Sequence, residues 1–202
     1  MAHDTLDLLD WKRRIFELYA EIRRTPDPET AWQRWRLVRD ELFGSHPQTP
    51  LPPKRRAGFA GVDYYAYDPA ARVHAEVVPA EADPIEIVGT AGSTVTARRF
   101  AFARFELVGE PWALELYWLQ GYGGGIFLPF GDTTNGHETY GSGRYLLDSV
   151  KGADLGMASE RMVLDFNFAY NPSCSYDPRW ACPLTPPENR LPTEIAAGER
   201  TL

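Results

Sequence analysis

Residues that could carry out chemistry are concentrated between positions 129 and 148, where glycines surround carboxylates, a histidine, tyrosines and an arginine. Asp132 and Glu138 could exchange protons with a bound molecule, because carboxylates that face a substrate act as general acids or bases. Arg144 could hold an anionic or carbonyl group through its planar guanidinium. His137 and Tyr140 lie in the same stretch and are predicted to contact the same ligand.

The glycine pattern predicts how these side chains are placed. The Gly-Ser-Gly at 141–143 is typical of a three-residue hairpin loop, because glycine adopts the positive φ that such loops require. In this register Tyr140 faces Arg144 across the hairpin, and Glu138 lies on the same face as both. Residues 132–136 are typical of a turn in which Asp and Asn side chains satisfy their own backbone.

A second concentration of polar residues spans positions 164–191. Asp165 and Asn167 alternate with apolar residues, so a strand would display both on one face. The rest of the stretch is rich in proline and poor in periodic apolar positions, which predicts a long irregular strap. Five polar residues of the strap are expected to satisfy its backbone groups: Asn171, Asp177, Glu188, Asn189 and Arg190.

Two hypotheses explain both stretches. In the first, they line a cleft that binds a small anionic or carbonyl compound, as in an acid/base hydrolase or isomerase. In the second, the same groups form a buried network that fastens the strap to the β domain, and the protein is a non-catalytic binding or interaction module. The first hypothesis assigns Asp132, Glu138 and Asp165 as acids or bases, and His137, Tyr140, Arg144 and Asn167 as ligand contacts.

A zinc site formed by His137, Cys174 and Cys182 is a third hypothesis. The cysteines are seven residues apart rather than paired as CxxC, so the pattern is not typical of a structural zinc site, and no residue is assigned as a metal ligand. Small buried thiols are the simpler interpretation. The sequence contains no dinucleotide-binding or phosphate-binding glycine motif, so it indicates no cofactor.

Two helices are expected at the amino terminus. Residues 5–44 carry apolar side chains at spacings of three and four, which is typical of amphipathic helices. Asp27 is predicted to cap the second helix, with Pro28 at its first position and Gly44 at its carboxyl end. The tryptophans of this part are interpreted as packing groups.

From residue 58 onward the apolar period is two, and Gly, Pro and Asp turns separate short alternating runs. The predicted fold is therefore mainly β (α+β): an antiparallel β-barrel or sandwich over 58–202, preceded by the helices of 5–44, with a proline-rich C-terminal strap. We expect one domain over 1–202. Strands are expected at 62–67, 72–77, 85–88, 94–107, 112–118, 125–130, 137–140, 143–148 and 161–168.

The two polar stretches carry long motifs, among them Glu138-Thr139-Tyr140-Gly141, Asp165-Phe166-Asn167, Ala169-Tyr170-Asn171-Pro172 and Glu188-Asn189-Arg190-Leu191. In these motifs the chain resembles the bacterial domain of unknown function 1684 family, and the similarity covers most of the chain. The resemblance implies no reaction. It does imply that polar residue types belong to the family pattern at Asp132, Glu138, Arg144, Asp165 and Asn167.

Composition limits the partners. A net charge of −7 and a pI of about 5.1 argue against a nucleic-acid binder, which needs surplus Lys and Arg to displace phosphate counterions. No apolar run is long enough to span a bilayer, and the amino terminus lacks the order of a secretory signal. We therefore expect a cytoplasmic protein with a small-molecule ligand and without nucleic-acid or membrane partners. The sequence indicates neither the ligand nor the oligomeric state.

Overall fold

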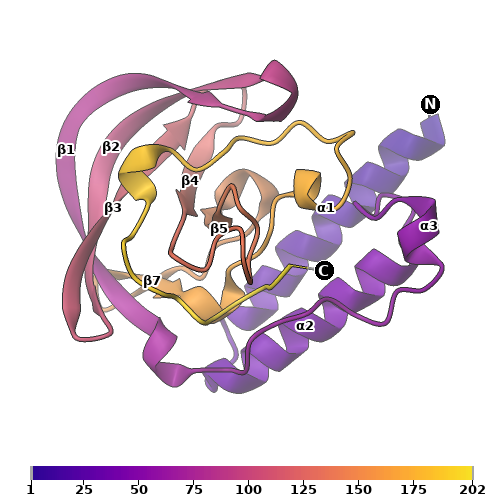
Figure 1. The fold of residues 1–202 in the computed structure, drawn as a ribbon, viewed down its shortest axis with the longest axis horizontal. Helices are drawn as coiled ribbons and strands as arrows, with labels where there is room; N and C mark the ends of the chain where they lie inside the picture. Colours follow the sequence, from indigo (N-terminus) through magenta and orange to yellow (C-terminus); the bar gives the residue numbers. More distant parts are fainter. Residues whose placement is uncertain (1, 202) are drawn as a thin grey trace.

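Two helices form one layer of the molecule and lie beside a curved sheet (Figure 1). In the computed structural model, which describes residues 2–201, α1 spans Ala2–Ile22 and α2 spans Pro28–Ser45. A single turn, α3 (Pro53–Arg56), follows them. No helix in the described range is long and apolar enough to cross a membrane.

The start of α2 is the one that the sequence predicts. The Asp27 side chain accepts the Thr30 N–H at 2.8 Å, and Pro28 occupies the first position, where its missing N–H costs no hydrogen bond. The predicted end is wrong. Gly44 lies inside the helix, and His46 follows the last turn and donates its N–H to a carbonyl within it.

Seven antiparallel strands form one sheet in the order β5-β4-β3-β2-β1-β7-β6. The first two strands are long, and each bends at a point where its pairing register shifts. The strands are β1 (Arg72–Val88), β2 (Thr94–Leu107), β3 (Glu110–Leu119), β4 (Gly125–Phe130), β5 (Arg144–Asp148), β6 (Met157–Ala158) and β7 (Arg161–Asp165).

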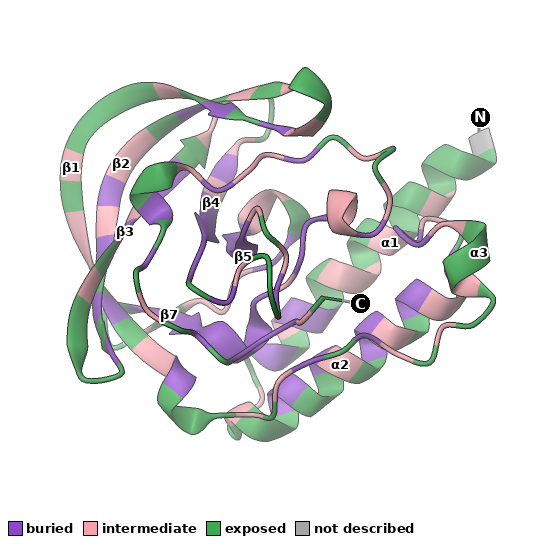
Figure 2. Ribbon diagram, in the orientation of Figure 1, coloured by how far each residue is buried: buried purple, intermediate pink, exposed green. Residues whose placement is uncertain are grey.

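The expected closed barrel or sandwich is wrong, because this single sheet does not close. At the β5 edge, Tyr145 exchanges two backbone hydrogen bonds, of 2.8 and 3.0 Å, with Tyr170. Tyr170 belongs to the irregular C-terminal segment, residues 169–201. That segment therefore takes the place that a closing strand would occupy. In Figure 2, β4, β5 and β7 are buried along most of their length, whereas β1 is exposed over much of its length.

Several expected strands differ from the observed ones. Residues 72–77 and 85–88 belong to the one strand β1, which is bent between Pro79 and Asp83. Residues 62–67 and 137–140 form no strand. The end of the expected 161–168 strand, and five other short segments, are 3₁₀ turns: η1 (Pro69–Ala71), η2 (Thr90–Gly92), η3 (Ser149–Lys151), η4 (Phe166–Phe168), η5 (Ser173–Ser175) and η6 (Pro187–Asn189).

Among the described residues the core has one part inside the curve of the sheet, a second between the sheet and the helices, and a smaller third part around Tyr117, Phe127 and Tyr145. Phe130 and Phe166 meet edge to face in the first part, with ring centroids 5.1 Å apart. Trp35 packs on Phe168 in the second, at 5.2 Å. Burial of these large rings holds the two layers together, since each removes a large apolar surface from water.

Candidate functional site

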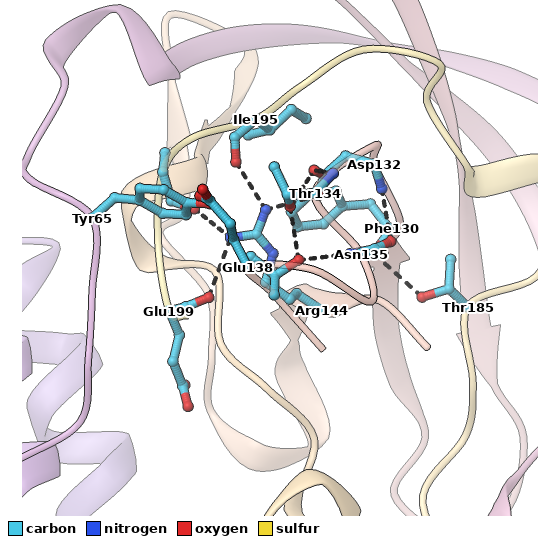
Figure 3. Close-up of polar contacts among 12 residues, drawn as sticks. Tyr65, Phe130, Asp132, Thr134, Asn135, Glu138, Arg144, Thr185, Ile195 and Glu199 are labelled. Atoms are coloured by element: carbon cyan, nitrogen blue, oxygen red, sulfur yellow. Dashed lines mark hydrogen bonds and ion pairs between the residues drawn. The ribbon is translucent and has the colours of Figure 1, made fainter. Parts of the chain in front are cut away.

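Arg144, the first residue of β5, lies at the centre of a buried network (Figure 3). Its Nη2 donates to Asp132 Oδ2 at 2.8 Å and to the Ile195 carbonyl at 3.0 Å. Its Nη1 donates to the carbonyls of Ala197 and Glu199. One guanidinium therefore joins the turn after β4 to three carbonyls of the C-terminal segment.

The other oxygen of Asp132 holds the turn that follows it. Asp132 Oδ1 accepts the Thr134 N–H at 2.9 Å and the Thr134 hydroxyl at 2.5 Å. The Asp132 N–H donates to Asn135 Oδ1 at 2.9 Å. The predicted turn over 132–136, in which Asp and Asn side chains bond to local backbone, is confirmed by these contacts.

Asp165 and Asn167 form a second buried group, where β7 runs into η4. Asp165 Oδ2 pairs with Arg72 Nη1 at 3.0 Å, and its Oδ1 accepts the Asn167 N–H at 3.1 Å. The Asn167 side chain exchanges two hydrogen bonds, of 2.8 and 2.9 Å, with the backbone of Asp68. Burial raises the pKa of Asp165 above its usual range, and Arg72 and Asn167 oppose that rise.

Three of the seven predicted site residues are at least partly accessible. His137 and Glu138 are exposed, and Tyr140 is half-buried. Glu138 accepts a hydrogen bond from the Tyr65 hydroxyl at 2.5 Å. Partial burial, together with this carboxylate, raises the pKa of Tyr65 to about 12. Tyr140 Oη lies 3.6 Å from the sulfur of Cys174.

The structure brings Asp132 together with Arg144, and Asp165 together with Asn167. It does not form the expected hairpin face of Glu138, Tyr140 and Arg144, because residues 137–140 turn back on residues 134–136 instead of pairing with β5. The side chains of Arg144, Asp132 and Asp165 are 0% exposed, and Asn167 is equally buried. The Arg144–Asp132 pair ties the turn after β4 to residues 195–199, as a fastening network would, whereas within residues 2–201 the Asp165 and Asn167 side chains contact Arg72 and Asp68 and not the strap.

The zinc hypothesis lacks a set of donors. Within residues 2–201, no group of three or more His, Cys, Asp and Glu side chains is placed to hold a metal ion. Cys174 and Cys182 are free thiols.

A different feature has the properties of a ligand site. A cavity of about 410 Å³ opens between α1, α2 and the C-terminal segment, a volume typical of small-molecule sites. Its wall is mostly apolar. The lining residues are Leu8, Trp11, Lys12, Ile15, Tyr19, Trp35, Arg39, Gln48, Pro50, Val150, Lys151, Ala153, Tyr170, Ser173, Trp180, Ala181 and Cys182.

Three polar side chains of this wall lie close together. The Arg39 guanidinium carbon lies 5.2 Å from the ring centre of Tyr170, and Arg39 and Tyr170 each interact electrostatically with Tyr19. The Tyr19 hydroxyl accepts a hydrogen bond from Trp35 at 3.1 Å. Within residues 2–201, neither tyrosine hydroxyl donates a hydrogen bond to an acceptor. Burial raises the pKa of both tyrosines, that of Tyr19 to about 12, so both hydroxyls keep their protons.

Arg39 links this cavity to the buried end of the chain. Its Nη2 donates to Glu199 Oε2 at 2.7 Å, and its Nε donates to the Tyr64 hydroxyl at 3.0 Å. Among the described residues, its Nη1 has no hydrogen-bond partner. Burial raises the pKa of Glu199 to about 7, although Arg39 and the backbone and side chain of Asn171 lower it.

The charges of the lining differ from those of the whole chain. Lys12, Arg39 and Lys151 line the cavity, and no Asp or Glu does. The chain has 28 acidic and 21 basic residues, so this bias is not a consequence of composition. The acidic partners lie behind the wall, where Glu199 pairs with Arg39, and Asp148 pairs with Lys151 at 3.3 Å.

Comparison with known proteins shows which family this chain belongs to. Residues 57–200 match the family described as "Protein of unknown function (DUF1684)". The chain belongs to this family. The solution NMR structure of an uncharacterized protein from Haloarcula marismortui is similar to this DUF1684 chain, with 35% sequence identity and a TM-score of 0.60. The match covers 86% of this chain and 94% of that one. None of the curated proteins matches.

The DUF1684 match covers only one side of the cavity wall. The 170–182 side lies inside residues 57–200, whereas α1 and α2 lie before them. The likeness to the Haloarcula protein covers a larger share of the chain than residues 57–200 make up, so it reaches into the part before residue 57. The family match therefore covers the strap side of the cavity but not its helical side.

Sequence reasoning missed this cavity. Trp11 and Trp35 are interpreted as packing groups, which describes only part of their surroundings, because both also line the cavity. One available signal was Arg39, which follows Trp35 by one helical turn and so lies on the apolar face of α2. An arginine on such a face requires a buried partner or a polar cavity.

Proposed function

We propose that this DUF1684 protein binds a small carboxylic acid with an apolar body in the cavity between α1, α2 and the C-terminal segment. The observation that carries the proposal is the cluster of Tyr19, Arg39 and Tyr170 at an otherwise apolar wall. Each offers a donor without an acceptor among the described residues. A ligand acceptor placed there would form hydrogen bonds that the described residues do not form among themselves.

The charges favour a carboxylate over a neutral acceptor. Lys12, Arg39 and Lys151 line the cavity, and no Asp or Glu is among the lining residues, although Glu199 and Asp148 pair with two of these cations from behind the wall. Hydrogen bonds between a guanidinium and a carboxylate are stronger than neutral ones. The aromatic and aliphatic side chains of the remaining wall suit an apolar body. The ligand class agrees with the anionic or carbonyl compound expected from the sequence, but the binding residues are different ones. Binding, without a chemical reaction, is what we propose.

Calorimetric titration with octanoate and 1-octanol at pH 7.5 tests this proposal. The two probes have the same alkyl chain, so their difference reports the carboxylate. Octanoate is expected to bind at least about tenfold more tightly, since a charged hydrogen bond contributes about 1.5–3 kcal/mol. Equal affinities would contradict the carboxylate assignment, and absence of binding by both probes would contradict the site.

Two pairs of variants place the ligand. Tyr170→Phe removes one donor and is expected to weaken octanoate binding, whereas Tyr122→Phe, at a fully exposed tyrosine, is not. Ala181 is exposed and lines the cavity, so Ala181→Phe is expected to obstruct it without disturbing the core. Ala82→Phe, at an exposed position of β1, is its control. Unchanged binding in Ala181→Phe would place octanoate elsewhere.

A further inference from the structure

Two thiols lie together at one side of this cavity. Cys182 is buried and lines the cavity, and Cys174 is partly accessible beside it. The Cys174 N–H donates to the Cys182 sulfur at 3.4 Å, and each thiol shifts the pKa of the other. Two neighbouring free thiols differ from a single buried cysteine, because when one of them is oxidised the other is close enough to attack it and form a disulfide.

The surroundings shift the pKa values of the two thiols in opposite directions. Tyr140 Oη lies 3.6 Å from the Cys174 sulfur, and the Thr90 hydroxyl also interacts with it. The hydrogen bond from Cys182, followed by those from Tyr140 and Thr90, lowers the pKa of Cys174 to about 6, although partial burial opposes this. The same thiol pair, together with burial, raises the pKa of Cys182. The surroundings therefore favour ionisation of Cys174 over ionisation of Cys182.

We propose that Cys174 and Cys182 form a hydroperoxide-reactive dithiol, in which Cys174 is oxidised first and Cys182 then closes a disulfide. Accessibility supports this order, because Cys174, which is oxidised first, is the more accessible residue of the two. The backbone between them contains only the short turn η5 and no strand, so no sheet ladder has to break when the sulfurs join. This site is independent of the carboxylate proposal.

The proposed reaction balances in two steps. In the first, the Cys174 thiolate attacks one oxygen of the hydroperoxide, an S–O bond forms and the O–O bond breaks. The leaving alkoxide takes up a proton, and Cys174 becomes a sulfenic acid. In the second, the Cys182 sulfur attacks the Cys174 sulfur, an S–S bond forms and the S–O bond breaks. The Cys182 proton leaves with the hydroxide as water, so two thiols and one hydroperoxide give a disulfide, an alcohol and water.

Intact mass measurement of the native full chain tests the proposal without any variant. After treatment with hydrogen peroxide at pH 6, each chain is expected to lose two hydrogens. Digestion should then give one peptide pair joined through Cys174 and Cys182, and dithiothreitol should restore the starting mass. A chain that keeps both thiols, or gains only oxygen, overturns the proposal.

The reaction rate tests whether the site activates Cys174. Because the pKa of Cys174 is lowered to about 6, more of this thiol than of glutathione is ionised at pH 6. The larger thiolate fraction outweighs its lower nucleophilicity, so Cys174 should react about tenfold faster than glutathione. In Cys182→Ser, dimedone should trap a sulfenic acid on Cys174. In Cys174→Ser, Cys182 should react no faster than glutathione. Equal rates for the native chain and Cys174→Ser would contradict the assigned order.

Discussion

Arg144 and Asp132 form an ion pair of 2.8 Å in which both side chains are 0% exposed to solvent. Two charges taken out of water are costly unless their hydrogen-bonding atoms find partners. Here both Asp132 oxygens and both terminal nitrogens of Arg144 do, while the buried Arg144 Nε has no partner among the described residues. The pair joins the turn after β4 to the carbonyls of residues 195–199. It therefore works as an internal tie between segments that are far apart in the chain.

Arg144→Ala is expected to lower the free energy of unfolding by about 3–5 kcal/mol, because it leaves the buried Asp132 carboxylate without its counter-charge. Urea denaturation of the full chain measures this. Arg14→Ala is the control. It removes the arginine of the exposed Arg14–Glu41 pair and should cost no more than about 1 kcal/mol. If Arg144→Ala leaves stability unchanged but abolishes ligand binding, Arg144 belongs to a ligand site instead.

Glu199 is expected to make stability depend on pH. Its pKa is about 7 in the folded chain and 4.5 for the free side chain, so between these values the folded state holds a proton that the unfolded chain has released. The free energy of unfolding therefore decreases as the pH rises through this range, by about 3 kcal/mol from this group.

Glu199→Gln removes this titration while keeping a side chain of similar shape. The difference in unfolding free energy between the native chain and the variant should change with pH between 4.5 and 7, and stay constant above 7.5. Denaturant titrations at a series of pH values measure it. A difference that does not change across this range would show that Glu199 titrates at its ordinary pKa.

Gly198→Ala is expected to destabilise the chain more than Gly92→Ala. Both glycines have positive φ, of 80° and 70°, so both variants carry the backbone strain of that region, about 1–2 kcal/mol. Only at Gly198 would a Cβ also collide with its surroundings, 2.6 Å from the Phe166 carbonyl oxygen. Overpacking adds about 1–3 kcal/mol there. Equal losses in thermal denaturation would mean that the segment around residue 198 is not packed against η4.

Asn189→Ala is expected to loosen the strap where it crosses the sheet. The buried Asn189 side chain accepts the Glu115 N–H at 2.7 Å and donates to the carbonyls of Glu115 and Pro129. Loss of these partners should cost about 2–4 kcal/mol. Hydrogen exchange gives a local readout, because the Glu115 amide should lose its protection. A Glu115 amide that stays protected would show that another group takes the place of Asn189.

Features of this molecule that depend on short-range interactions could be predicted from the sequence. The cap at Asp27, Pro28 after it, and the side-chain-bonded turn at 132–136 depend on residues a few positions apart, and all are found in the structure. The strands expected at 94–107 and 125–130 likewise correspond to β2 and β4 with the observed bounds. The cap and the turn are stabilised by contacts within a few residues, whereas β2 and β4 also depend on hydrogen bonds to neighbouring strands.

The buried ion pairs, the open sheet and the cavity depend on contacts between segments that are far apart in the chain. Arg144 meets Ile195 and Ala197 about fifty positions further on, and Arg39 meets Glu199 from the opposite end of the chain. No period or spacing encodes such pairings, so a polar pattern alone could not distinguish a solvent-facing site from a buried tie. The open sheet and the cavity beside α1 and α2 have the same origin, because each depends on where the irregular C-terminal segment packs.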